Sequence, residues 1–233
     1  MPAEQIIFSH PPATEVRVEV TFPNNLDVAD KRSQFSKLVR AEFPLVVMPE
    51  QNKMPYDLAD YALYTEDMAE RIEIGMSYFR IATTRYPGFR KFRSLCLSAL
   101  GLFSGCYELK RFSNLAMTYQ NKLPVESEHK RFEDIFKFDI RIPAELRSEL
   151  FTGKGMLVFQ KPEGFITIDV DPQAGASWID WYAFTLYFVT IPNTVVEADK
   201  ESLERVVDIA HDYVENFFFG MLSEQYLKYL RSK

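Results

Sequence analysis

The sequence predicts an α+β protein made of two related β-α-β-β-β-α units, each with a curved antiparallel sheet packed on a long helix. First, a segment ending Thr21-Phe22-Pro23-Asn24 recurs as Thr118-Tyr119-Gln120-Asn121, 97 residues later (118 minus 21). Second, each half shows the order strand, helix, three strands, long helix. Third, 20 Phe and 12 Tyr with only 9 Gly favour long strands with bulky cross-strand neighbours.

The first half, residues 1–110, opens with a strand in which Val16, Val18 and Val20 alternate with polar residues. A helix capped by Asn25 or Asp27 follows and must end at Pro44. Further strands are expected at 45–48, 61–65 and 71–84. In the last of these, one face should carry Ile72, Ile74, Met76, Tyr78 and Arg80.

A long helix closes the first half. Its apolar residues recur at spacings of three and four between Phe89 and Phe103, and Gly105 should end it. Cys96 lies on the apolar face, and the opposite face is basic.

The second half, residues 111–233, should repeat this order, either as a separate small domain or fused with the first half. We expect a strand at 111–122, a short helix at 126–135, a strand at 136–142 and a helical turn at 143–146. Strands at 156–160 and 165–170 form a hairpin. The strand at 178–190 is apolar on both faces apart from Asp180, so both faces should be covered. An amphipathic helix with an acidic polar face spans 203–222.

Composition restricts the class of protein. The longest uncharged run, 181–196, contains Pro192 and is too short to span a bilayer, so we expect no membrane segment. Residues 1–5 are neither basic nor apolar, so we expect no secretory signal, and two cysteines suit a reduced cytoplasmic protein. We expect no cofactor and no metal. Asp169, Asp171 and Asp180 could converge on a cation, although strand ends entering turns look the same.

Several segments resemble a sporadically distributed prokaryotic family whose members have about this length and no established activity. The segment Pro11-Pro12-Ala13-Thr14-Glu15-Val16 resembles the start of that family, and 86–92 (Tyr-Pro-Gly-Phe-Arg-Lys-Phe) resembles its Tyr-x-Gly-aromatic motif. Residues 118–121 match its Arg-Tyr-x-Asn motif except at Thr118, and the closing helix through His211 resembles its ending. The element order is also similar to TATA-binding-protein-like and helix-grip architectures. The family resemblance supplies no catalytic residues and implies a bacterial or archaeal protein from variable genomes.

No residue set has the spacing of a catalytic centre, and His211, with Asp208 and Asp212 nearby, is more typical of a helix surface. We therefore expect a non-enzymatic protein-interaction module that binds a partner protein or itself. Its setting would be a toxin–antitoxin or phage-defence locus.

One charged window stands out against the net charge of −6, which disfavours nucleic acid as a partner. Residues 80–111 hold seven basic residues and one acidic residue, which gives +6 and leaves −12 for the remainder. Two alternatives stay open: a nucleic-acid binder using this window, and a small-molecule binder using the concavity between sheet and helix. The residues predicted to bind an anion or a partner are Arg80, Arg85, Arg90, Arg93 and Tyr86.

Overall fold

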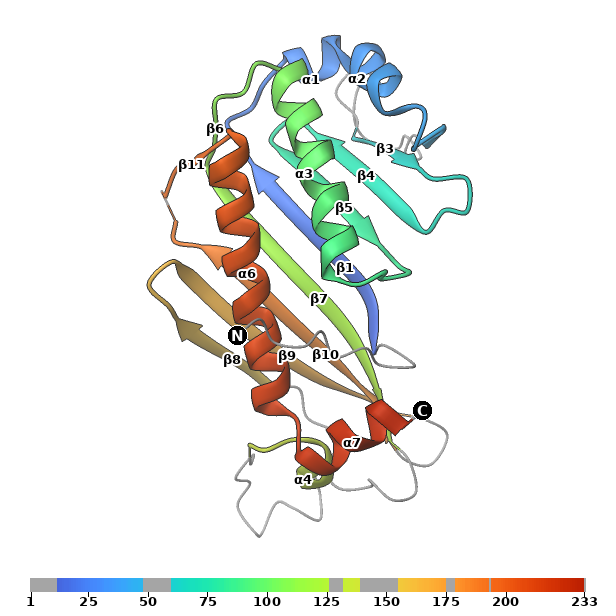
Figure 1. The fold of residues 1–233 in the computed structure, drawn as a ribbon, viewed down its shortest axis with the longest axis vertical. Coiled ribbons are helices and arrows are strands. Elements are labelled where there is room, and N and C mark those ends of the chain that lie inside the picture. Colours follow the sequence, from blue (N-terminus) through green and yellow to red (C-terminus); the bar gives the residue numbers. More distant parts are fainter. Residues whose placement is uncertain are drawn as a thin grey trace.

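The protein is mixed α and β, with one large antiparallel sheet and helices over it (Figure 1). A computed structural model describes residues 12–47, 60–125, 132–138, 155–174, 179–192 and 194–232. The predicted helical turn at 143–146 lies outside these residues, as do parts of the elements predicted at 126–135 and 136–142.

Nine strands form the main sheet in the order β2-β3-β4-β5-β1-β7-β10-β9-β8. All of its neighbouring strands run antiparallel. In chain order the strands are β1 (Ala13–Thr21), β2 (Leu45–Val47), β3 (Tyr61–Tyr64), β4 (Glu70–Gly75), β5 (Tyr78–Thr83), β7 (Asn114–Pro124), β8 (Gly155–Gln160), β9 (Gly164–Ala174) and β10 (Ile179–Thr190). A second sheet pairs β6 (Arg111–Phe112) with β11 (Val196–Glu197).

The β1–β7 pair joins the two halves in the middle of the sheet. Val18 lies opposite Met117 there, and Val20 lies opposite Leu115. Outward from this pair, the first half continues through β5, β4 and β3, and the second half through β10, β9 and β8. The two halves therefore share one continuous sheet.

The prediction of a single strand over 71–84 is wrong, because this segment is a hairpin. β4 and β5 are joined by a turn at Met76-Ser77, and Gly75 lies opposite Tyr78. A Cβ atom on Gly75 would come within 2.3 Å of the Tyr78 ring, so this ring leaves no room for a side chain at Gly75 in its present position. The turn reverses the chain, so Ile72 and Arg80 lie on opposite faces of the sheet.

The described helices pack on one face of the sheet. The long helices are α3 (Phe89–Cys106) and α6 (Lys200–Met221), which lie side by side in Figure 1. At one end, α1 (Asp27–Asp30) and α2 (Arg32–Val39) cover the first half, and at the other end lie α4 (Phe132–Ile135) and α7 (Glu224–Ser232). No described helix is long and apolar enough to cross a membrane.

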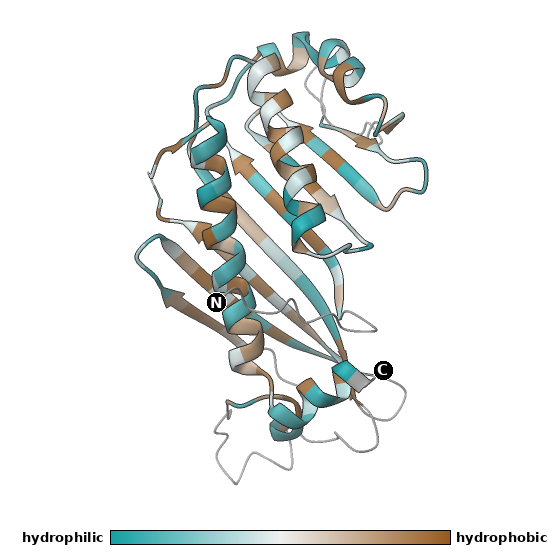
Figure 2. Cartoon of the chain, viewed as in Figure 1, coloured by the Kyte–Doolittle hydropathy of each residue, from teal (hydrophilic) through white to brown (hydrophobic). Residues whose placement is uncertain are grey.

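The core lies between these helices and the facing side of the strands. Period-two alternation puts Val16, Val18 and Val20 fully out of water while their neighbours stay half-buried. The same alternation along the strands is visible in Figure 2. Phe35 of α2 meets Phe79 of β5 edge-on at 6.1 Å between ring centroids, and Phe79 lies 4.4 Å from Phe103 of α3. Aromatic packing therefore fixes the helices on the sheet.

Both long helices begin at identifiable residues. Gly88 precedes α3 with a φ of 91°, a conformation that favours glycine. Asp199 precedes α6, and its side chain accepts a hydrogen bond from the backbone N–H of Ser202 at 2.9 Å. The apolar stripe predicted for 203–222 forms as expected and buries Leu203, Val207 and Val214.

The second half departs from prediction in three places. Phe136 forms only an isolated bridge with Leu222, so the described part of 136–142 is not a regular strand. The α7 helix was not predicted from the sequence. It buries Tyr226, whose hydroxyl donates a hydrogen bond to the Pro124 carbonyl at 2.9 Å. The expectation that both faces of β10 are covered also fails within the described residues, because alternate β10 side chains lie on the helix-free face.

Candidate partner-binding face

The face of the main sheet that no described helix covers carries two kinds of side chain. We call it the open face. Over β4, β5 and β1 it is charged, and over β7, β10, β9 and β8 it carries aromatic, hydroxyl and aliphatic side chains together with Lys122, Asp169 and Asp171. The strand registers place these residues on it: Glu15, Arg17, Glu19, Arg71, Glu73, Arg80, Thr118, Lys122, Met156, Val158, Phe165, Thr167, Asp169, Asp171, Trp181, Thr185 and Tyr187.

An alternating chain of acids and bases crosses the charged part. Arg80 bonds Glu19 with one nitrogen at 2.6 Å and Glu73 with another at 2.5 Å. Arg71 bonds Glu73 at 2.5 Å and Glu15 at 2.8 Å. Arg17 continues the chain from Glu15 at 3.7 Å. We call these six residues the ion-pair chain.

The ion-pair chain has no net charge, since three arginines face three glutamates. Burial raises the pKa of the Glu73 carboxyl, but hydrogen bonds and charge from Arg71 and Arg80 outweigh it and hold that pKa below its usual value. Arg71 reaches Glu15 over the small side chain of Ala82, which pairs with Arg71 on one side and Arg17 on the other. The strand register thus builds this network.

The remainder of the open face has the chemistry of a protein-binding surface. Trp181 and Tyr187 stand half-buried on β10, six residues apart, and Phe165 of β9 lies opposite Val189, next to Tyr187 on the same face. The Lys122 ammonium lies 5.0 Å from the centre of the Trp181 ring. Burial raises the pKa of Tyr187, and the charges of Glu19 and Arg17 act on it from the ion-pair chain. Tyr187 therefore stands where the two parts of the face meet.

The five residues predicted as a binding site do not come together. Arg80 lies in the ion-pair chain on the open face, whereas Arg93 lies in the helix layer. Arg85 is exposed and bonds Asp67 at 2.8 Å. Arg90 is exposed on the first turn of α3, and Tyr86 is half-buried against Phe92. Three of the four arginines thus already have carboxylate partners.

The opposite charges predicted on the two long helices meet across the seam between α3 and α6. Arg93 of α3 contacts Asp208 of α6 through two hydrogen bonds of 2.6 and 2.9 Å. Glu204 adds a contact of 3.4 Å. These ion pairs link the two long helices. Part of the charge separation seen in the sequence is therefore neutralised inside the molecule.

A chain of aromatic hydrogen bonds lies in the same seam. The Tyr119 hydroxyl lies 3.0 Å from the Tyr86 hydroxyl and 3.1 Å from Nδ1 of His211. Phe89 stacks on the His211 ring with centroids 3.6 Å apart. Burial lowers the pKa of His211 to about 4, against the opposing charge of Asp208, so the ring is neutral at pH 7.

This seam was only partly visible in the sequence. From the sequence, His211 was expected near Asp208 and Asp212, and Tyr119 was expected in a strand. The hydrogen bond between Tyr119 and His211 was not predictable, because it depends on which turn of α6 lies over β7. The alternation of Arg and Glu in 15–19 and 71–73 is the sequence signal that could have indicated the ion-pair chain.

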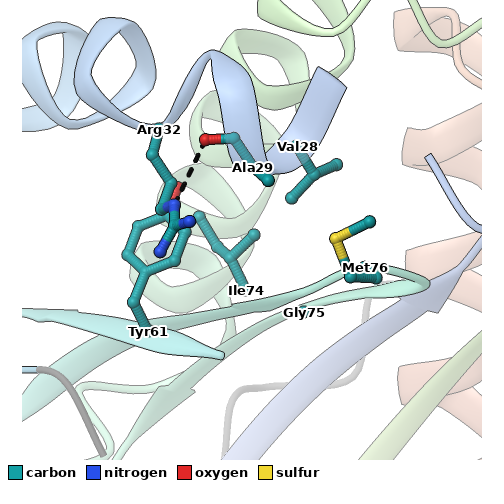
Figure 3. Close-up of a pocket in the computed structure, with 7 residues that line it drawn as sticks. All are labelled: Val28, Ala29, Arg32, Tyr61, Ile74, Gly75 and Met76. Atoms are coloured by element: carbon teal, nitrogen blue, oxygen red, sulfur yellow. Dashed lines mark hydrogen bonds between the residues drawn. The ribbon is translucent and has the colours of Figure 1, made fainter. Parts of the chain in front are cut away.

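Figure 3 shows a pocket between α1, α2 and the β4–β5 turn. Its volume is about 10 Å³, and its lining residues are Val28, Ala29, Arg32, Tyr61, Ile74, Gly75 and Met76. Sites for small molecules usually measure about 300–1,000 Å³. The pocket has room for about one water molecule.

Within the described ranges, no three His, Cys, Asp or Glu side chains gather closely enough to hold a metal ion. Cys96 is buried and Cys106 partly so, and both are free thiols. Burial raises the pKa of the Cys96 thiol well above its ordinary value.

Comparison with known proteins names no family for this chain. It matches no protein-family model, and no curated protein matches it. The resemblance to the prokaryotic family therefore stays a prediction from the sequence.

Proposed function

We propose that this chain is a non-enzymatic, cytoplasmic protein-interaction module that binds a partner protein on its open face. The observation that carries the proposal is a row of three half-buried aromatic side chains, Trp181, Tyr187 and Phe165, along a face that no described helix covers. Phe165 lies next to Tyr187, and Trp181 lies six residues farther along β10. Aromatic residues and methionine are enriched in protein interfaces, where rigid aromatic side chains act as anchors.

The ion-pair chain supports specific rather than nonspecific binding of a partner on this face. Its six side chains are already paired, so they present fixed donors and acceptors to a partner and lose little side-chain freedom on binding. A partner that fits would be apolar opposite Trp181 and Tyr187 and polar opposite the ion-pair chain.

The strand order supports a duplicated architecture. In each half the first strand of the main sheet, β1 or β7, lies at the centre, and the later main-sheet strands follow outward in reverse chain order. A long helix, α3 or α6, comes after these strands on the same face of the sheet. The four-residue match does not support it in the same way, because Thr21 ends β1 whereas Thr118 lies inside β7. We propose duplication on topology, and a toxin–antitoxin or phage-defence locus as the setting.

The two alternatives have weaker support. The pocket of about 10 Å³ gives no support to small-molecule binding between sheet and helices. In the basic window, Arg80, Arg85 and Arg93 would have to leave Glu19, Asp67 and Asp208 before they could neutralise phosphates.

The test begins with affinity purification from the native host under gentle conditions, followed by reconstitution of the complex from purified proteins. Trp181→Ala and Tyr187→Ala should each weaken binding by at least about tenfold, as expected for aromatic anchors. The control is Arg90→Ala, an exposed change in the helix layer, which should leave the affinity unchanged. Equal affinity of all three variants, or a chain recovered alone and monomeric, would overturn the proposal.

A further inference from the structure

Exposed apolar side chains concentrate on the two edges of the sheet. Among the described residues, six of the eleven large hydrophobic side chains that are exposed belong to the edge strands β2 and β8. On β8 these are Met156, Leu157 and Val158, with 66%, 40% and 57% of their surface exposed. Within the described part of the chain, β8 pairs only with β9.

The backbone of β8 has hydrogen-bonding groups that point away from the sheet. Lys161 and Gly164 exchange two hydrogen bonds, of 2.8 and 3.3 Å, just beyond the end of the β8–β9 ladder. In an antiparallel ladder such pairs alternate, so Phe159 and Leu157 also bond inward to β9. The N–H and C=O groups of Met156, Val158 and Gln160 therefore face outward.

This edge lacks the usual protection against pairing. Natural edge strands are commonly short, charged, bulged or interrupted by proline. Residues 155–160 (Gly-Met-Leu-Val-Phe-Gln) contain no charge and no proline, and their register with β9 has no bulge. The other edge, β2, is only three residues long.

We propose that β8 pairs antiparallel with β8 of a second copy of this chain, around a two-fold axis at Val158. A second copy fits because an uncharged strand meets no like charge when it pairs with itself. This proposal is independent of the partner proposed for the open face.

The outward-facing residues fix the register. Val158 lies opposite Val158 of the second copy, and Met156 lies opposite Gln160, which gives about six backbone hydrogen bonds. On the helix side, Leu157 meets Phe159 of the second copy. Lys161 lies opposite Gly155, which has no side chain to obstruct it. The open faces of the two copies then lie on the same side of one continuous sheet.

Sedimentation of the full chain at micromolar concentrations tests the pairing. The wild type should be a dimer. Val158→Lys and Val158→Glu should each weaken the dimer at least tenfold, because two like charges meet at the axis, and a mixture of the two variants should form a heterodimer. Val158→Pro should also give a folded monomer, since that N–H makes no bond to β9, while Val158→Thr should stay dimeric.

The matched control is Val46→Lys, on the other edge strand, where the exposed fraction of the side chain is 54%. It should leave the dimer intact, and circular dichroism should show that every variant is folded. A monomeric wild type, a dimer that Val46→Lys dissociates, or charge variants that fail to associate when mixed would each overturn the proposal.

Discussion

Arg93 of α3 and Asp208 of α6 form a two-point ion pair, with one bond of 2.6 Å and one of 2.9 Å. The residues are 115 positions apart and come from different halves of the chain. The basic face of one long helix is therefore a partner for the acidic face of the other. Part of the charge separation in the sequence is therefore neutralised by a contact within the molecule.

The ion pair predicts a measurable coupling between the two helices. Arg93→Met and Asp208→Asn should each lower the free energy of unfolding, and a double-mutant cycle should give a coupling energy of about 1 kcal/mol, the upper range for partly exposed pairs. Urea denaturation measures it, and added salt should reduce it. Arg90→Met is the control and should change stability by no more than about 0.5 kcal/mol. A coupling near zero at low salt would contradict the assignment.

His211 predicts a loss of stability as the pH falls. Burial lowers its pKa in the folded protein from 6.5 to about 4. Between these values the unfolded chain binds a proton that the folded chain does not, so stability is highest above pH 6.5 and declines toward pH 4. The full effect is about 3 kcal/mol.

The contribution of His211 is isolated by comparison with His211→Gln. Urea denaturation at about pH 7 and about pH 4.5 should show a steeper loss for the wild type than for the variant. Burial raises the pKa values of Asp212 and Glu215, which act in the opposite direction, and the comparison largely removes their contribution. Identical pH dependence in both proteins would show that His211 is not held neutral.

Glu73 holds the middle of the ion-pair chain. Glu73→Gln keeps its shape but removes the charge between Arg71 and Arg80, so the free energy of unfolding should fall by about 1–2 kcal/mol. Glu66→Gln, in the exposed turn before β4, is the control. Chemical denaturation compares the two. A loss for Glu73→Gln no larger than that of the control would mean that the chain does not stabilise the sheet.

The hairpin at Gly75 predicts a steric effect that depends on one neighbour. Gly75→Ala places a methyl group 2.3 Å from the Tyr78 ring and should cost about 1–3 kcal/mol. The loss should be smaller in a Tyr78→Ala background, because the ring is then absent. Thermal unfolding of the four proteins measures both values, and an equal loss in both backgrounds would contradict the hairpin geometry.

Local patterns of apolar residues predicted most elements, because the spacing of these residues depends on which side of a strand or helix is buried. The alternation at Val16, Val18 and Val20 and the stripe on α6 both formed as expected. The β4–β5 turn was missed because Gly75-Met76-Ser77 lacks proline, aspartate and asparagine, and the apolar residues on each side continue one run. The α7 helix was missed because its buried face meets α4 and β7, far away in the sequence.

The site was less predictable than the fold. Charge counting found the basic window, but an ion pair is set by cross-strand register and helix packing, which one segment does not specify. Arg80 was predicted as a binding residue, and its neighbours Glu19 and Glu73 come from two other strands. Part of the basic window is therefore neutralised by ion pairs within the molecule.

Site-specific photocrosslinking in the native host tests the proposed open-face interaction most directly. A photoreactive phenylalanine at Tyr187 reports on the open face, and one at Arg90 reports on the helix layer. A partner protein crosslinked from position 187 and absent from position 90, whose purified complex Trp181→Ala weakens at least about tenfold, is the result we predict. Crosslinks from position 90 alone, or none from position 187, would contradict it.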